Sequence, residues 1–309
     1  MFKGIARSRV MKDLTAKAEQ IAKIPRPVMI RGERGTGKEL MADFIHKASP
    51  RAGKNFIAIN CAAFNDELLN SEIYGHEKGA FTGADSTKIG RLEQASGGTL
   101  FMDEIGNMSL SFQERILRVV EYQKFERLSG TETIQADVRI VSATNADLEE
   151  MMNENLFRRD LYDRLTFAEI KIPPLRQRRE DIPHLIVHFV RGLHEEIPNI
   201  VTRTFKRETV EQMMEYHWPG NIRELKNVVE RVYLYSEENI ILPDCLPKEI
   251  GGSTFTITAD SFDEKVEQFK KKLIFEALED AGNNQRAAAE RLEMTYDQFR
   301  HFYRKFKES

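Results

Sequence analysis

The sequence has little cysteine and no long apolar run. Cys61 and Cys245 are its two cysteines among 309 residues, far apart and without metal-ligand spacing. This scarcity excludes a disulfide scaffold and favours a reduced, cytoplasmic protein. No stretch approaches the roughly 18 consecutive apolar residues of a membrane-spanning helix, and residues 1–9 lack the apolar core of a secretory signal. We therefore expect neither membrane insertion nor secretion.

Net charge is also nearly absent. Lys and Arg total 46 against 49 Asp and Glu, which gives a formal charge of −3. This balance argues against a protein that coats nucleic acid along its whole length. It leaves open a short basic segment at one end of the chain that binds nucleic acid. The hydrophobic share of 41% and the charged share of 31% exclude a disordered or fibrous chain. At roughly 100–200 residues per domain, the length suggests two or three domains.

The first part of the chain alternates apolar runs with amphipathic helices. A helical lead-in within residues 1–26 places Val10, Leu14, Ala18 and Ile21 on one face. Apolar runs at 28–30, 56–59, 99–102 and 138–141 predict buried strands, with helices at 39–47 and 111–122 between them. This alternation predicts an α/β layer fold with a mostly parallel sheet.

The strand signals stop near Pro174, and helical periodicity alone follows. We expect an α/β domain at residues 1–172 and a helical subdomain at 173–246. A segment rich in Pro, Gly, Ser and Thr at 247–261 is typical of a linker. Residues 262–309 return to helical periodicity and predict a third, all-α unit.

A glycine-rich loop directly follows the first predicted strand and precedes a helix. It reads Gly32-Glu33-Arg34-Gly35-Thr36-Gly37-Lys38-Glu39. Glycines let the backbone wrap a phosphate, N–H groups at a helix start bind anions, and Lys38 would contact the β- and γ-phosphates. Glu39 stands where a Mg²⁺-binding hydroxyl is usual, and Thr36 is not assigned that role. The alternative is a simple strand–helix turn, but the strand–loop–helix context favours ATP binding.

Two carboxylates end the third apolar run. We predict that Asp103 holds Mg²⁺ through water and that Glu104 polarises an attacking water. The pair would alternatively cap the next helix. Asn145 follows another predicted strand and would orient the water or sense the γ-phosphate, unless it is only a turn residue. Together with the loop at Lys38, these residues favour ATP hydrolysis.

Residues 79–84 carry the most specific resemblance. They read Gly79-Ala80-Phe81-Thr82-Gly83-Ala84, which reproduces the GAFTGA loop of the AAA+ activators of sigma-54 RNA polymerase, the bacterial enhancer-binding proteins. The phosphate loop with Glu39 and the stretches 98–106, 143–147 and 218–231 also look like family signatures. The short layout resembles the phage-shock activators most. The resemblance implies an AAA+ P-loop core with a parallel sheet, a helical lid and a C-terminal Fis-type helix-turn-helix domain.

The resemblance also implies roles for individual residues. The loop around Phe81 would contact sigma-54 when ATP is bound, although from the residues alone a Phe81 tucked into the core is the favoured alternative. Asn60 matches an asparagine that pairs with Glu104.

Three arginines gain roles in the same way. Arg158 and Arg164 match arginine fingers that reach a neighbouring subunit, and Arg223 matches a lid arginine at the γ-phosphate. Fingers acting in trans imply a ring, a homo-hexamer. Without the resemblance, two arginines on a short helix are usually a solvated basic face.

The C-terminal unit predicts two short helices, at 285–292 and 296–306, with Thr295 as N-cap of the second. This arrangement is typical of a helix-turn-helix, and the resemblance identifies it as Fis-type. The expected DNA contacts on its last helix are Tyr296, Gln298, Arg300, His301, Arg304 and Lys305. A three-helix oligomerisation tail is the alternative. Glu293 replaces a frequent family glycine, so a left-handed turn there would be slightly strained.

The function implied is that of an ATP-driven activator that binds upstream enhancer DNA and remodels the sigma-54 RNA polymerase closed complex to an open complex. One rival is another AAA+ remodeller, which fails to explain the GAFTGA loop beside a helix-turn-helix. The other is a DNA-binding repressor with a degenerate ATPase core, against which the intact Lys38, Asp103 and Glu104 argue. Residues 1–26 leave no room for a receiver or sensor domain. We therefore expect control by an inhibitory regulator protein, by DNA-bound oligomerisation or by expression level.

Overall fold

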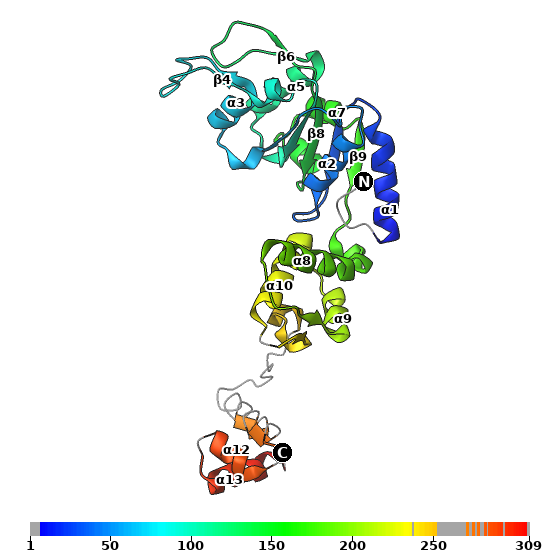
Figure 1. Ribbon diagram of the computed structural model, residues 1–309. Helices are drawn as coiled ribbons and strands as arrows, with labels where there is room; N and C mark the ends of the chain where they lie inside the picture. The colour runs from blue at the N-terminus through cyan, green and yellow to red at the C-terminus, as the bar shows by residue number, and fades with distance from the viewer. Residues whose placement is uncertain are drawn as a thin grey trace. The chain divides into compact units, whose positions relative to one another are not determined.

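The structure, a computed structural model, forms two compact units, Met1–Ile250 and Gly251–Ser309 (Figure 1). It describes residues 7–236, 238–251, 270–271, 274–275, 277–278, 281–282, 284–292 and 294–307, with the side chains of 297, 301 and 307 left out. Within these ranges, no helix has the length and apolar character needed to cross a bilayer.

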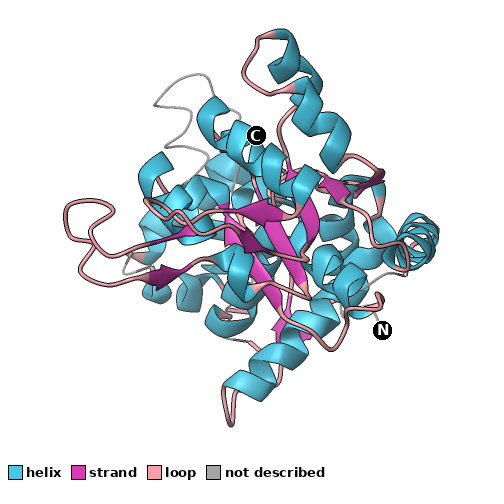
Figure 2. Cartoon of the chain, turned by 90° about the horizontal axis from the view of Figure 1, so that it is seen from above, coloured by secondary structure: helices cyan, strands magenta, loops and turns pink. Residues whose placement is uncertain are grey.

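A five-stranded parallel sheet forms the centre of the first unit, which confirms the predicted α/β class. Its order is β2-β5-β8-β1-β9, and Figure 2 shows these strands enclosed by helices. The strands are β1 (Val28–Arg31), β2 (Phe56–Asn60), β5 (Thr99–Asp103), β8 (Arg139–Thr144) and β9 (Ala168–Lys171). The sequence pattern did not predict β9, because this edge strand alternates charged with apolar residues and has no continuous apolar run.

Alternate side chains of each strand enter two different cores. On β1, Val28 and Ile30 pack with the helices α1 and α2, whereas Met29 packs with α3, α5 and α7. This period of two is what a sheet covered on both faces requires. The helices are α1 (Arg9–Ala22), α2 (Lys38–Lys47), α3 (Asp66–Tyr74), α4 (Arg91–Gln94), α5 (Leu110–Tyr122), α6 (Leu148–Asn153) and α7 (Arg159–Leu165).

The buried face of helix α1 differs from the face predicted from the sequence. Val10 is 50% exposed, whereas its neighbour Met11 is buried together with Ala18 and Ala22. The buried stripe is therefore set by Met11, which lies one helix turn from Leu14 and two turns from Ala18.

Two short hairpins project from the sheet's helical layer. One pairs β3 (Gly75–His76) with β4 (Lys88–Ile89), and the other pairs β6 (Lys124–Phe125) with β7 (Ile134–Gln135). A backbone bridge joins His76 to Leu128, so the strand β3 of the first hairpin is bound to the loop of the second. The predicted sigma-54 loop lies between β3 and β4.

The lid follows β9 and has its own core around Trp218. Its helices are α8 (Ile182–Glu196), α9 (Arg207–Glu215) and α10 (Asn221–Tyr235), with single turns η3 (Leu175–Gln177) and η4 (Arg179–Asp181). The expectation of helix alone was wrong for β10 (Thr204–Phe205) and β11 (Ile240–Ile241), which pair in parallel and are too short to show periodicity. The turn η6 (Lys248–Ile250) buries Ile250 in the lid core, past the predicted start of the linker.

The second unit contains α12 (Gln285–Arg291) and α13 (Tyr296–Lys307). Its core joins Ile274 and Leu278 to Ala288, Phe299 and Phe306. The described residues between 270 and 278 are helical, in agreement with the all-α unit predicted for residues 262–309. Residues 252–261 of the predicted linker and the turn residue Glu293 lie outside the described residues.

Candidate functional site

The glycine-rich loop connects β1 to α2 at the carboxyl edge of the sheet. Gly35 and Gly37 adopt φ angles of 75° and 97°, in the left-handed region that favours glycine. A Cβ on Gly35 would lie 2.3 Å from the carbonyl oxygen of Gly220. The loop therefore needs glycine both for its backbone path and for its close approach to the lid.

Lys38, the first residue of α2, reaches back into this loop. Its Nζ donates to the carbonyl oxygens of Gly32 at 3.0 Å and Glu33 at 3.3 Å. Burial lowers the pKa of Lys38, while the nearby charges of Asp103 and Glu104 raise it. The Thr36 hydroxyl donates to the Glu33 carbonyl at 2.8 Å and is buried, so it is engaged inside the loop. The loop thus places the Lys38 ammonium beside the N–H groups at the start of α2, a combination that is typical of anion-binding sites.

The two predicted acids lie at the end of β5, beside this loop. Burial raises the pKa of Asp103, and its Oδ1 accepts from the backbone N–H of Glu104 at 2.9 Å. Glu104 itself has a φ of 56°, and its Oε1 lies 3.8 Å from Nε of Arg34. A non-glycine residue held in this conformation is a local strain of the kind found at functional sites.

Asn60 lies next to Asp103, because β2 and β5 align these two residues. Its Oδ1 accepts from the N–H of Ala62 at 2.8 Å and caps the turn η1 (Cys61–Ala63). The amide oxygen of Asn60 therefore accepts a hydrogen bond within its own turn. A bond between Asn60 and Glu104 stays a prediction.

Asn145 follows β8 at the same edge and is exposed. The residue before it, Thr144, accepts a hydrogen bond from the N–H of Gly32 at 3.3 Å. Asn145 therefore stands beside the first glycine of the phosphate loop.

The start of α10 closes over the loop from the lid. The N–H of Ile222 donates to the Gly35 carbonyl at 3.0 Å, and the buried Asn221 side chain donates to the Arg34 carbonyl at 2.9 Å. Arg223 follows directly, and its charge lowers the pKa of Lys38. The sequence pattern did not single out Asn221, although a polar residue two positions before the predicted site residue Arg223 was a signal.

A second lid contact reaches the loop through Arg176. Its guanidinium binds both carboxylate oxygens of Glu33, at 2.6 and 2.8 Å. Such bidentate pairs fix geometry as well as charge, so lid and phosphate loop form one continuous site.

The two predicted fingers belong to α7. Arg158 is the N-cap of this helix and pairs with Asp160 at 2.8 Å. Arg164 lies in its last turn, is 61% exposed and pairs with Glu121 at 2.9 Å. The acids that hold these two arginines belong to α7 and α5 rather than to the phosphate loop.

The loop at residues 79–84 closes on itself. The N–H of Gly79 donates to the Ala84 carbonyl at 2.8 Å, and Gly79 and Gly83 take φ angles of 83° and 96°. Phe81 remains 46% exposed, with its ring centroid 4.9 Å from that of His76. The alternative of a core-packed Phe81 is therefore wrong, because the ring leans on one histidine and leaves about half its surface in solvent.

In the second unit, Thr295 and Gln298 form a reciprocal cap at the start of α13. The N–H of Gln298 donates to Oγ1 of Thr295 at 3.3 Å, and the N–H of Thr295 donates to Oε1 of Gln298 at 3.0 Å. This is a capping box. Gln298 therefore has a structural task besides its predicted DNA contact.

The other predicted DNA contacts whose side chains are described lie on exposed positions of α13. Arg300, Arg304 and Lys305 are exposed, and Tyr296 is 38% exposed beneath the guanidinium of Arg286. The side chain of His301 lies outside the described residues.

Comparison with known families accounts for almost the whole chain. Residues 5–171 match the family described as sigma-54 interaction domain. Residues 176–261 match the AAA+ ATPase lid domain, and residues 265–308 match the bacterial regulatory proteins of the Fis family.

Individual relatives agree with this assignment. The Psp operon transcriptional activator of Escherichia coli (strain K12) is 42% identical over 306 residues, covering 95% of this chain and 94% of the relative. The Nif-specific regulatory protein of Azospirillum lipoferum is 48% identical over 76% of this chain, which spans only 38% of that regulator. The crystal structure of NtrX from Brucella abortus in complex with ADP matches with a TM-score of 0.74 and 34% identity, covering 100% of this chain and 69% of NtrX.

Proposed function

This chain belongs to the family of sigma-54-dependent transcriptional activators, and we propose that it binds enhancer DNA and remodels the sigma-54 RNA polymerase closed complex into an open complex. It is an AAA+ ATPase with a Fis-type helix-turn-helix domain. The observation that carries the proposal is the half-exposed Phe81 on a glycine-hinged loop, in the same unit as the phosphate site.

The residues around the phosphate loop have distinct tasks in the proposed hydrolysis. Backbone N–H groups of the loop and Lys38 bind the phosphates, and Glu104 accepts the proton of the attacking water. Asn145 orients that water, and Arg223 contacts the γ-phosphate from the lid. The half-buried carboxylate of Asp103 beside Lys38 fits a Mg²⁺ held through water, which would neutralise phosphate charge.

The complete site needs a second subunit. Arg158 and Arg164 are held by acids outside their own phosphate loop, which supports their use on a neighbour. An arginine finger is worth about 10³–10⁵ in rate. We therefore propose a homo-hexameric ring in which each subunit completes the site of the next.

The second unit supplies the proposed DNA interface. Exposed Arg300, Arg304 and Lys305 lie along α13, where they would hold phosphates. Tyr296 and Gln298 near its start would contact base edges. We also propose His301, a residue of the same helix, as a DNA contact. This local basic helix supports enhancer binding in a chain with a net charge of −3.

The proposed setting of the protein is the cytoplasm, with sigma-54 RNA polymerase and enhancer DNA as partners. The similarity to a Psp operon transcriptional activator supports a phage-shock role. Control by an inhibitory regulator protein is a further part of the proposal. We propose domain boundaries at residues 1–172 for the α/β subdomain, 173–250 for the lid and 262–309 for the DNA-binding domain, with a linker between the last two.

Replacing Phe81 tests the loop's role. We expect Phe81→Ala to retain ATPase activity and to lose activation of a sigma-54 promoter, because the ring makes its contacts at the loop rather than at the phosphate site. The control is Leu68→Ala, which removes a side chain of similar exposure from α3. Transcription in vitro and phosphate release measure the two activities. Normal promoter activation by Phe81→Ala would refute the assignment.

A further inference from the structure

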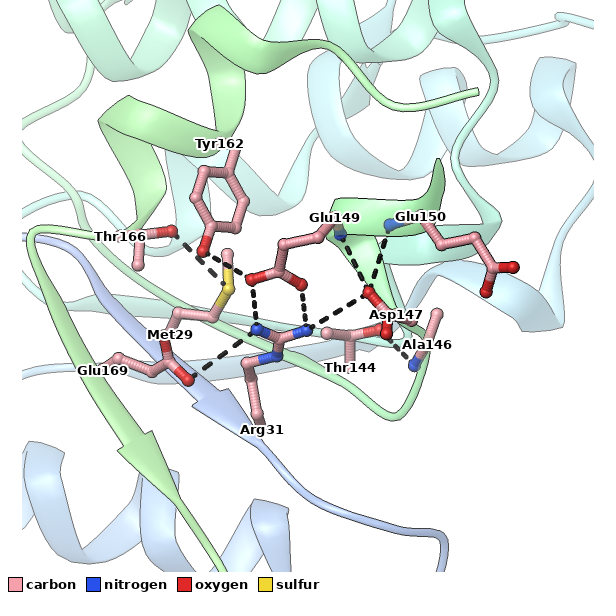
Figure 3. A network of polar contacts seen from close by, with 10 residues as sticks. All are labelled: Met29, Arg31, Thr144, Ala146, Asp147, Glu149, Glu150, Tyr162, Thr166 and Glu169. Carbon is pink, nitrogen blue, oxygen red and sulfur yellow. Dashed lines mark hydrogen bonds and ion pairs between the residues drawn. The ribbon is translucent and has the colours of Figure 1, made fainter. Parts of the chain in front are cut away.

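The last residue of β1, directly before the phosphate loop, is an arginine with three acidic neighbours (Figure 3). Its Nη1 and Nη2 donate to the two carboxylate oxygens of Glu149 at 2.7 and 2.5 Å. Asp147 lies 4.0 Å and Glu169 3.9 Å from the same guanidinium. The Arg31 side chain is only 19% exposed, so this fork is fixed by its surroundings rather than free in solvent.

The same carboxylate also contacts the helix that carries the fingers. The Tyr162 hydroxyl donates to Oε1 of Glu149 at 3.1 Å. Tyr162 belongs to α7, and its N–H donates to the carbonyl of Arg158 at 3.1 Å. Figure 3 shows Arg31, Glu149 and Tyr162 converging from β1, α6 and α7.

The protonation states of the residues in this network favour a stable set of hydrogen bonds. The hydrogen bonds from Arg31 lower the pKa of Glu149 to about 2, and the nearby carboxylates raise the pKa of Arg31 further. Burial raises the pKa of Tyr162, which keeps its hydroxyl protonated as a donor. At neutral pH every member is therefore in the state that its hydrogen bonds require.

We propose that Arg31, Glu149 and Tyr162 are positioning residues that set α7 against the phosphate loop of their own subunit and thereby aim Arg158 and Arg164 at the neighbouring subunit's site. The inference rests on the proposed trans action of the fingers. None of the three residues contacts the nucleotide in this role. Because Arg31 adjoins Gly32, the network also links the phosphate loop of one site to the finger delivered to the next.

The size of the effect follows from the chemistry. Loss of one hydrogen bond to a charged group corresponds to about a tenfold change. A misplacement of about 1 Å at a catalytic group costs on the order of 10²-fold in rate. We expect Tyr162→Phe, which keeps the ring, to lower kcat about tenfold with little change in KM for ATP, and Arg31→Met to lower it further.

Mixed rings separate positioning from a general structural effect. Donor subunits carry Glu104→Ala, which inactivates their own site but leaves their fingers intact. Acceptor subunits carry Arg164→Ala, which leaves their site intact but removes a finger. Co-assembled donor and acceptor subunits should hydrolyse ATP although neither does so alone.

The network variant is then placed in one subunit type at a time. With Tyr162→Phe in the donor, we expect ATP turnover of the mixed ring to fall about tenfold; in the acceptor, we expect no change. The matched control is Glu150→Gln in the donor, since Figure 3 shows this neighbouring side chain pointing away from Arg31. Thermal unfolding of each variant monitors the fold.

Two outcomes would overturn the proposal. Loss of turnover only when Tyr162→Phe is in the acceptor would mean that the network acts on its own subunit's site, and unchanged turnover in both placements would mean that it positions nothing. An inactive parental mixture would instead contradict the trans action of Arg164, and the inference would fall with that premise.

Discussion

At the residue scale, the phosphate site contains a buried cation, and keeping this group charged away from water is energetically unfavourable. Lys38 is only 7% exposed, and its ammonium is satisfied by two loop carbonyls and by the charges of Asp103 and Glu104. Burial disfavours the charged form of such a group, whereas a bound phosphate favours it. Nucleotide binding and the protonation of Lys38 are therefore coupled.

This coupling predicts a pH dependence with a definite sign. Burial lowers the pKa of Lys38 in the free chain, and phosphate binding raises it again, so binding takes up a proton at alkaline pH. Affinity for ATP should fall as the pH rises through the pKa of the free chain. Calorimetry in two buffers of different ionisation enthalpy measures the proton. Proton release on binding, or uptake that persists in Lys38→Met, would contradict this account.

A second buried cation stabilises the fold. Arg139 is 4% exposed and donates to the carbonyl oxygens of Ala22 at 2.6 Å, Ile21 at 3.1 Å and Arg26 at 3.2 Å. The carbonyls of Ile21 and Ala22 lie in the last turn of α1, where helix carbonyls lack partners within the helix. The Ile21 carbonyl also accepts from the N–H of Ile24 at 3.1 Å. Arg139 thus joins α1 to the central strand β8.

Removing this cation should destabilise the first unit. We expect Arg139→Met to lower the free energy of unfolding by about 3 kcal/mol, because buried carbonyls lose their donor. Denaturant unfolding measures the change. The exposed Arg159→Met is the control, with an expected change within about 0.5 kcal/mol. Equal effects of the two substitutions would show that the contacts at α1 contribute nothing.

At the element scale, the start of α13 combines a helix cap with a proposed DNA contact. Gln298→Ala breaks the capping box, so we expect both a loss of about 1 kcal/mol in helix stability and weaker DNA binding. Gln298→Glu keeps the acceptor for the Thr295 N–H but brings a negative charge to the DNA. It should therefore retain stability and lose affinity. Circular dichroism and DNA-binding titration report the two effects, and unchanged DNA affinity in Gln298→Glu would remove Gln298 from the interface.

Elements with a strong local signal were predictable from the sequence. The strands β1 and β5 are mostly apolar and buried, so the sequence pattern predicted both their existence and their burial. The strand β8 is buried although it contains Arg139, and β2, at the edge of the sheet, buries only Ile59 completely. The edge strand β9 and the two-residue strands of the lid depend on partners elsewhere in the chain, and no local pattern identifies them. Capping by Thr295 was visible because its chemistry is local.

The functional residues show the same division. Lys38, Asp103 and Glu104 were recognisable because a loop, two acids and their strand contexts form contiguous motifs. Asn221 and the network of Arg31 with Glu149 were not, since their bonds join residues more than a hundred positions apart. Such contacts become visible only once the sheet and the lid are assembled.

At the scale of the whole molecule, two compact units divide the work. The first, Met1–Ile250, carries the phosphate site, the lid and the Phe81 loop, and the second carries the cationic α13. The net charge of −3 is an average over these parts. In our account, ATP is hydrolysed where the first units of two neighbouring subunits meet. The second unit of each subunit binds DNA.

Open-complex formation at a sigma-54 promoter tests this account most directly. Purified polymerase, promoter DNA with its upstream site and the full chain are combined, and promoter melting is measured with ATP and with a non-hydrolysable analogue. We predict melting with the native chain and ATP only, and none with Glu104→Ala, which should still bind ATP and assemble. Melting by Glu104→Ala, or by the native chain with the analogue, would contradict hydrolysis-driven remodelling.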